Sequence, residues 1–286
     1  MFLEKEGLRG RARALLPADP KIYKHLPYVI ELDDEVVRTR DNGLMISLEV
    51  TGIDGITSGF SAITALRAGF AHLLDTLDER FSFYLHRMMR PANAQLKPIH
   101  GQSFAADIDR AWSAELQRRN LQESVLILTV VRRQVTPLAV PFFGKAAAKV
   151  WGEDTDRRLE ELREVVSILE TGLGVKSHRL KISDGSLIGF YASLLTGELR
   201  SKSRTAFGLI AEDASDAAVR FGKGQFTVEE GEDTPRFGAV LYVKSYATST
   251  WPGMLDALGA SRDTIITHSY TPIERGSITE RVKRRV

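Results

Sequence analysis

Cysteine is missing from this 286-residue sequence. Its absence excludes disulfide bonds, thiolate metal sites and cysteine nucleophiles, and it is typical of a reducing compartment. The sequence also has no apolar run long enough for a membrane-spanning helix. The longest covers residues 125–131, whereas such a helix needs ~20 residues. Glu4 and Glu6 interrupt the N-terminus, where a secretion signal would be apolar. We therefore expect a cytoplasmic protein whose partners can lie in a membrane.

The chain has no strong excess of either charge. Lys and Arg number 39 against 37 Asp and Glu, a net charge of +2, so no global field favours nucleic acid as a partner. Residues 1–25 are locally basic and are broken by Pro17 and Pro20. We expect a mobile tail there; the alternative is an arm that docks on a partner or on an anionic membrane surface.

Nucleotide-binding motifs are absent as well. A Walker A loop reads G-x-x-x-x-G-K-[ST], so that backbone amides cradle the phosphates while the lysine and the hydroxyl complete the site. Gly144-Lys145 and Gly222-Lys223 both lack the first glycine and the final hydroxyl, and no G-x-G-x-x-G fingerprint occurs. Neither Gly-Lys pair is therefore expected to bind phosphate.

The groups that carry out acid–base or metal chemistry are scattered. The six histidines form no H-E-x-x-H motif and no close group with acids at ligand spacing. Gly55-Ile56-Thr57-Ser58-Gly59 resembles a nucleophile elbow, but Thr57 stands at the nucleophile position. We expect no catalytic, metal-binding or cofactor-binding residue in this chain. The alternative is a stand-alone enzyme whose site carries no recognisable motif.

Strands and helices alternate along the chain with short connections. This order predicts an α+β fold with a mixed or mostly antiparallel sheet and helices packed on one face. Asn42-Gly43 predicts a hairpin between residues 36–40 and 44–50, because a tight turn needs positive φ at its centre. Residues 124–133 are apolar on both faces and should form a central strand. The other expected strands span residues 81–89, 175–182, 217–221, 225–229, 237–243 and 264–270.

Helices are expected where apolar residues recur at helical spacing. Ser58 should cap a first helix that runs to about residue 77, and Ser103 should open a second. The apolar residues of the second helix form one i, i+4 row: Phe104, Ile108, Trp112 and Leu116. A proline-containing loop is expected over residues 134–152. An amphipathic helix is expected over residues 154–170 and a short helix over residues 187–195.

Two further helices are expected near the C-terminus. Pro252 suits the first turn of one, and Gly259 suits the position that ends it. Thr271-Pro272-Ile273-Glu274 is a capping box that begins the other. No glycine or proline ends this last helix, so we expect the natural protein to continue beyond Val286.

Charge pairs are expected on the outer face of the helix over residues 154–170. Asp154 and Arg158, and likewise Arg157 and Glu161, stand four residues apart, the spacing at which opposite charges stabilise a helix surface. The expected domains are a basic arm (residues 1–25), an α+β domain (26–272) that can divide near residues 134–152, and the start of a linker helix (273–286).

Five residues are candidates for contact with a partner. Trp251 is one, although it would equally suit the core, where it would lock its loop onto the sheet. The others are strand-end arginines, which are more often solvated or ion-paired: Arg87, Arg90, Arg132 and Arg133. Nucleic-acid binding needs basic residues interleaved with exposed aromatics, and these arginines are the best candidates for that alternative.

The region from Arg236 to Tyr270 resembles a hallmark region of the CagE–TrbE–VirB family, the cytoplasmic ATPases of type IV secretion and conjugation systems. The resemblance rests on Arg236-Phe237-Gly238-Ala239, Lys244-Ser245-Tyr246, Thr250-Trp251-Pro252-Gly253 and Thr267-His268-Ser269-Tyr270. Weaker similarity extends over nearly the whole chain, except for residues 134–152 and 197–235.

This resemblance implies that the chain is the N-terminal domain of a larger ATPase. In the family, such a domain precedes a RecA-like motor, which carries Walker A and Walker B and binds ATP and Mg. The domain docks the motor on inner-membrane components of the secretion channel, and the complete protein assembles as a hexamer. No catalytic or nucleotide-binding residue of the family can therefore be assigned to a position in this chain, and nucleic acid is not an expected partner of this domain.

Overall fold

The computed structural model describes residues 22–53, 57–91, 103–119, 121–134, 145–205, 209–229, 235–244, 248–249, 254 and 264–273. Residues 1–21 of the expected arm (1–25), the helix expected between Pro252 and Gly259 and the linker helix after Ile273 lie outside these residues. Within the described part, the chain begins with a short 3-10 helix, η1 (Ile22–His25).

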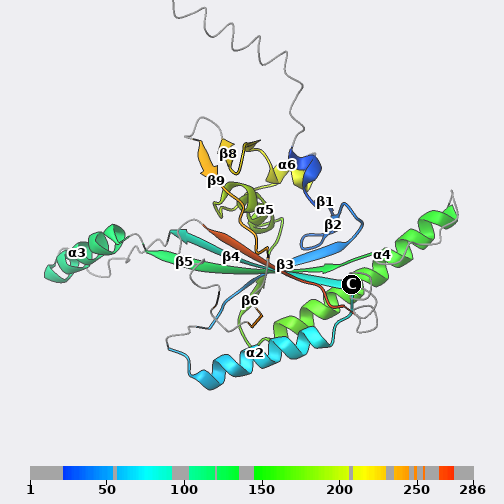
Figure 1. The fold of residues 1–286 in the computed structure, drawn as a ribbon, viewed down its shortest axis with the longest axis horizontal. Helices are drawn as coiled ribbons and strands as arrows, with labels where there is room; N and C mark the ends of the chain where they lie inside the picture. The colour runs from blue at the N-terminus through cyan, green and yellow to red at the C-terminus, as the bar shows by residue number, and fades with distance from the viewer. Residues whose placement is uncertain are drawn as a thin grey trace, which may run out of the picture.

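A seven-stranded antiparallel sheet forms the centre of the fold (Figure 1). Six strands follow the order β1-β2-β3-β5-β4-β10, and β6 pairs with β3 beside β2. Their bounds are β1 (Tyr28–Glu31), β2 (Val37–Thr39), β3 (Leu44–Val50), β4 (Phe81–Pro91), β5 (Gln122–Arg132), β6 (Ser177–Arg179) and β10 (Ile265–Tyr270). β5 lies between β3 and β4, which confirms the central position expected from its apolar sequence.

The predicted hairpin is present between β2 and β3. Asn42 has a φ of 63°, and the amide of Thr39 donates to the carbonyl of Gly43 at 2.8 Å. These contacts enclose a three-residue loop that needs the left-handed conformation only at Asn42, a residue type that tolerates it. The hairpin is therefore confirmed, with a loop one residue longer than the tightest turn.

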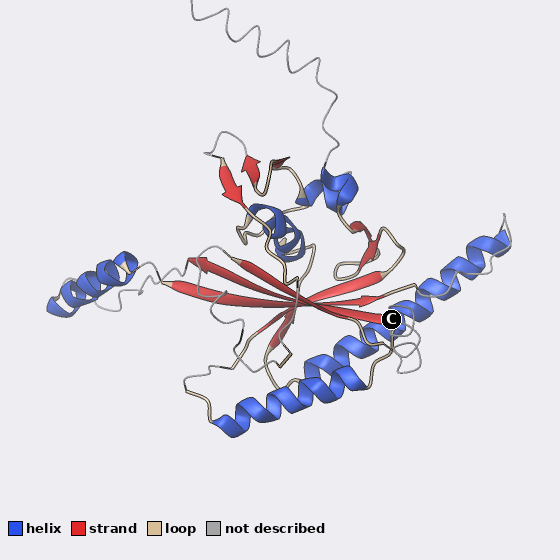
Figure 2. Cartoon of the chain, viewed as in Figure 1, coloured by secondary structure: helices blue, strands red, loops and turns tan. Residues whose placement is uncertain are grey.

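Helices cover both faces of the sheet, so the expectation of a single covered face is wrong (Figure 2). On one face, α4 (Lys145–Gly172) packs on β3 and β5, and α2 (Phe60–Asp75) contacts α4. On the other face lie α5 (Ser186–Thr196) and α6 (Ile210–Ala214). The reason lies in β5 itself: Leu128 and Val130 belong to the core beneath α4, while Val125 and Ile127 belong to the core beneath α5. A sheet with two apolar faces needs a cover on each.

Two predicted helix boundaries differ from the structure. α4 begins at Lys145, inside the expected loop over residues 134–152, because Ala146 to Ala148 are strong helix formers and no proline follows them. The N-cap of α2 is Gly59 rather than Ser58, so this helix has no side-chain cap at its start. α3 (Phe104–Arg118) begins as expected: Ser103 is its N-cap and accepts a hydrogen bond from the amide of Ala106.

The small second sheet consists of β7 (Ala218–Phe221), β8 (Phe226–Glu229) and β9 (Arg236–Gly238). The first two confirm the expected short strands. β9 is much shorter than the expected strand over residues 237–243, because Gly238 already pairs with Phe226, the first residue of β8. Beyond Phe226 the chain turns back toward β7, so residues 239–244 pair with no strand among the described residues.

The Asp154–Arg158 pair lies in the interior, although the helical spacing predicted the outer face. The Arg158 side chain is 2% exposed, and its Nε lies 2.8 Å from Asp154 Oδ2. Its Nη1 donates to the carbonyl of Asn42 at 2.6 Å and so ties α4 to the β2–β3 hairpin. Arg157 contacts Asp154 at 2.5 Å rather than the expected Glu161.

Candidate interaction surface

The strand-end arginines of β4 lie opposite residues of β5. Arg90 stands directly across from Glu123 in the register, and their side chains form a half-exposed ion pair. Opposite charges at such a cross-strand position stabilise the pairing of the two strands. Arg87 donates from Nε to Ser124 Oγ at 3.3 Å. Both arginines are thus held against β5, with part of each side chain at the surface.

Arg132, the last residue of β5, and Arg133, which follows it, have different surroundings. The Arg132 side chain is 7% exposed, and its Nε lies 2.6 Å from Glu161 Oε2 on α4. Its guanidinium carbon lies 5.6 Å from the centre of the Phe81 ring, a cation–π contact. Arg133 donates to the carbonyl of Glu79 and is partly exposed. Arg132 therefore stabilises the contact between α4 and β5 and offers little surface to a partner.

Trp251, the fifth sequence candidate, lies outside the described residues. The four arginines are not brought together into one basic surface: two lie beside β5 residues, one is buried, and one contacts a backbone carbonyl.

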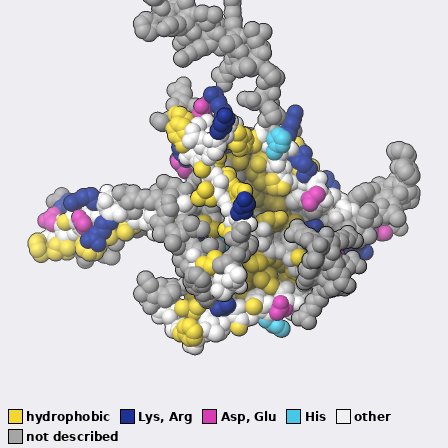
Figure 3. Space-filling model, in the orientation of Figure 1, with side chains coloured by type: hydrophobic (Ala, Val, Ile, Leu, Met, Phe, Trp, Pro, Cys, Tyr) yellow, Lys and Arg dark blue, Asp and Glu magenta, His cyan; other side chains and the backbone are white. Residues whose placement is uncertain are grey.

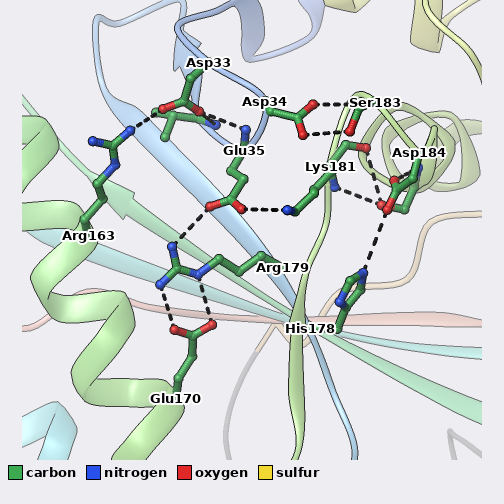
Figure 4. Close-up of polar contacts among 12 residues, drawn as sticks. Asp33, Asp34, Glu35, Arg163, Glu170, His178, Arg179, Lys181, Ser183 and Asp184 are labelled. Atoms are coloured by element: carbon green, nitrogen blue, oxygen red, sulfur yellow. Dashed lines mark hydrogen bonds and ion pairs between the residues drawn. The ribbon is translucent and has the colours of Figure 1, made fainter.

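A dense polar cluster joins the β1–β2 loop to α4 and to the segment after β6 (Figure 4). Arg179 binds both oxygens of Glu170 at 2.7 and 3.0 Å and Oε2 of Glu35 at 3.1 Å, and these bonds raise the pKa of its guanidinium. The backbone amide and hydroxyl of Ser183 donate to Asp34, which lowers the pKa of that carboxyl. Each acidic side chain shown in Figure 4 is paired with a cationic side chain or accepts a hydrogen bond. The cluster therefore stabilises the fold and is not an open binding site.

Among the histidines in the described part of the chain, His86 is the one with a clearly shifted pKa. Its ring lies between β10 and α5: Nδ1 is 3.0 Å from Thr267 Oγ1, and the ring meets the edge of Phe190 with centroids 5.2 Å apart. Burial disfavours the charged imidazolium and lowers the pKa of His86 from 6.5 to about 4. The neutral ring therefore contributes to the packing between β4, the neighbouring strand β10 and helix α5.

The described residues contain no group of three or more His, Asp or Glu residues that could hold a metal ion. Gly222 of the second Gly-Lys pair lies in the hairpin turn between β7 and β8, where its amide donates to the carbonyl of Gln225 at 2.8 Å. A phosphate loop leads from a strand into a helix, so this turn has a different architecture. None of the described helices is both long and apolar enough to cross a membrane.

One helix, α3, stands apart from the other described helices (Figure 1). The helix lies between β4 and β5 in sequence and projects beyond the paired ends of these strands, away from the other helices (Figure 1). Phe104 is 80% exposed, Ile108 53% and Trp112 54%. Figure 3 shows hydrophobic side chains on the surface of this projecting arm. The sequence showed this i, i+4 row, but its spacing is the same for a row that faces a core.

A second exposed apolar segment follows β9. Val240, Leu241 and Tyr242 are 78–87% exposed, in the segment that the sequence predicted to be a strand. Monomeric proteins seldom expose several large apolar side chains in succession unless that surface binds something. This segment and α3 therefore both present exposed large apolar side chains at the surface.

Two family models match the chain. Residues 35–138 match the N-terminal domain of the type IV secretion system ATPase VirB4/TrbE, and residues 174–286 match the CagE, TrbE, VirB family, a component of the type IV transporter system. The two ranges lie on either side of α4 in the sequence, and each supplies strands to the seven-stranded sheet. A search of the curated proteins finds no significant match.

Proposed function

Because the chain belongs to the VirB4/TrbE family of type IV secretion system ATPases, we propose that these 286 residues form a docking and assembly domain without catalytic activity of its own. The domain holds an ATP-hydrolysing motor, located in another part of the same protein, against inner-membrane components of the secretion channel. It acts on the cytoplasmic side of the membrane. The motor, with its ATP and Mg, powers pilus assembly and the transfer of DNA or protein.

The observation that carries this proposal is the exposed apolar segment after β9. Val240, Leu241 and Tyr242 follow the edge strand β9 and are strongly exposed, and no strand in the described part of the chain pairs with them. An extended segment of this kind can add a strand from a partner, since its backbone groups supply the hydrogen bonds and its side chains the specificity. We assign this segment to an inner-membrane component of the channel.

Co-purification from membranes tests the docking role. Leu241→Asp together with Tyr242→Asp in the complete ATPase should lower the recovery of inner-membrane channel components by tenfold or more, because two charges would enter an apolar contact. Phe221→Asp is the matched control, since Phe221 is 78% exposed in the same small sheet but lies on β7. Equal recovery with the double variant and the wild type would refute docking through this segment.

Nucleotide binding tests the non-catalytic role. Calorimetry with ATP and Mg on the 286-residue chain should give no heat of binding, because the sequence has no loop that would cradle the phosphates. Saturable binding, or ATP turnover that remains after removal of contaminants, would contradict the proposal. The described arginines do not favour the nucleic-acid alternative, since Arg132 is buried and Arg90 is paired with Glu123.

A further inference from the structure

The two outermost strands of the seven-stranded sheet differ in how well their edges are protected. β1 has four residues, an irregular register with β2 between Tyr28 and Ile30, and a charged residue, Glu31. Natural edge strands use short lengths, bulges and charges of this kind to avoid pairing with another chain. β10, at the other end of the sheet (orange-red in Figure 1), has six residues in an unbroken register with β4. Residues 264–273 contain no Asp, Glu, Lys or Arg, so β10 lacks the protection that β1 has.

The register with β4 determines which backbone groups of β10 point away from the sheet. The amide of Met89 donates to the carbonyl of Thr264 at 2.9 Å, so Ile265 stands in a non-hydrogen-bonded pair with β4. Such pairs alternate with hydrogen-bonded ones along the ladder, so the same holds for Thr267 and Ser269. The amides and carbonyls of these three residues therefore point to the open edge, and no strand in the described part of the chain pairs with them.

These backbone groups specify an extended chain as the partner, because alternating amides and carbonyls match the backbone of another strand. A second, antiparallel copy of β10 satisfies them. With Thr267 of both copies at a two-fold axis, Ile265 of one copy lies opposite Ser269 of the other, and each pair exchanges two hydrogen bonds. The two Thr267 side chains face each other at the axis, and Thr–Thr is a favourable cross-strand pair.

We propose that the open edge of β10 is a self-association surface, at which two copies of this chain pair their β10 strands antiparallel and join their sheets. Charge supports a second copy as the occupant, because a strand with no charged residue meets no like charge when it pairs with itself. The position of the strand supports it too, since Thr267, Ser269 and Tyr270 are exposed, Tyr270 by 42%.

The size of the edge predicts a weak contact. One pair of six-residue strands buries less than the about 800 Å² per partner of a stable interface, so the dimer should dissociate in the micromolar range or above. The contact is therefore suited to joining subunits that other surfaces of an assembly also hold together.

Sedimentation of the 286-residue chain over a wide concentration range tests the edge. The wild type should dimerise reversibly, and Ser269→Pro should weaken the dimer by tenfold or more, because proline removes an outward amide and places its ring in the contact. A wild-type chain that stays monomeric up to about 1 mM, where even a millimolar dissociation constant would be detected, would overturn the proposal. A dimer that Ser269→Pro leaves intact would overturn it as well.

His268→Pro is the matched control for the fold. Its amide faces β4 in the register, so this substitution should lower the melting temperature clearly, whereas Ser269→Pro should leave it close to that of the wild type. If the two variants are equally destabilised, the amide of Ser269 does not face the open edge and the proposed pairing is wrong.

A charge exchange at Thr267 tests the position of the axis. Thr267→Lys and Thr267→Glu should each weaken self-association by about two- to fivefold, because each places like charges directly opposite each other. Both variants lose the same contact with His86, so that loss does not distinguish them. An equimolar mixture should associate more tightly than either variant alone, since Lys then faces Glu. If the mixture is as weak as the single variants, the strands do not pair around Thr267.

Cross-linking provides an independent measure, because the chain contains no native cysteine. Thr267→Cys should give covalent dimers with a short bis-maleimide, since the two copies of this residue meet at the axis. Tyr84→Cys is the control: Tyr84 is 37% exposed on the same face but lies on β4, one strand behind the edge, so its two copies are far apart. Equal cross-linking at the two positions would contradict the assigned edge.

The inference rests on the proposed assembly role, and its failure can be told apart from failure of that role. A β10 edge that does not self-associate leaves the docking test at residues 241 and 242 unaffected. If the chain is monomeric but Ser269→Pro lowers the recovery of inner-membrane channel components, the edge takes a strand from a different protein, and self-association through β10 is overturned.

Discussion

Replacing Asp154 by Ala should destabilise the domain far more than the loss of an ordinary helix-surface ion pair. Arg158 is 2% exposed, and burial lowers the pKa of its guanidinium while the neighbouring Asp154 raises it. Without the carboxylate, the guanidinium keeps the Asn42 carbonyl at 2.6 Å but loses its closest counter-charge. Breaking a buried pair on one side costs about 3–5 kcal/mol, so we expect a ΔΔG of unfolding of this size.

Urea denaturation followed by far-UV circular dichroism measures this change. A loss of about 3–5 kcal/mol corresponds to a decrease of roughly 6–20 °C in melting temperature, at about 2–4 °C per kcal/mol for a large domain. The matched control is Asp107→Ala, which removes an ion pair whose side chains are 65–70% exposed, and its effect should stay within about 0.5 kcal/mol. The double variant Asp154→Leu with Arg158→Met should recover most of the loss, since it removes both charges together. A single-variant effect no larger than that of the control would refute the assignment of a buried pair.

Three other perturbations test separate parts of the fold. Between pH 6.5 and 4 the unfolded chain binds a proton that the buried His86 does not; stability should therefore be complete above pH 6.5 and fall by up to about 3 kcal/mol toward pH 4. His86→Gln should remove this part of the pH dependence in denaturation curves. Gly189→Ala should unfold the α5 face, because a Cβ there would lie 1.9 Å from the Arg200 carbonyl oxygen; thermal melts that match the wild type would contradict this. At the β2–β3 turn, Asn42→Gly should be nearly neutral and Asn42→Val should cost about 1–2 kcal/mol in the same assay, because φ is 63° there.

Local chemistry was sufficient to predict several elements. Asn42 permits the left-handed turn of the hairpin, and Ser103 supplies the cap of α3; both depend only on the residue and its immediate neighbours. The strand over residues 124–133 showed two apolar faces, and its central place in the sheet follows from that alone. The residues that resemble the CagE–TrbE–VirB family, between Arg236 and Tyr270, could also be recognised from the sequence alone.

What covers an apolar face, or what lies over a charge, was decided only by the tertiary structure. The row from Phe104 to Trp112 has the spacing of a core-facing helix, yet α3 projects beyond the strands that flank it, and the row is exposed. Asp154 and Arg158 have the spacing of a surface pair, yet the β2–β3 hairpin, more than a hundred residues away in sequence, covers them. Residues 239–244 alternate like a strand, but β8 begins at Phe226, and they pair with no strand of the part of the chain that the structure describes. Periodicity reports which side of an element is apolar; the packing of distant segments determines whether that side becomes core or surface.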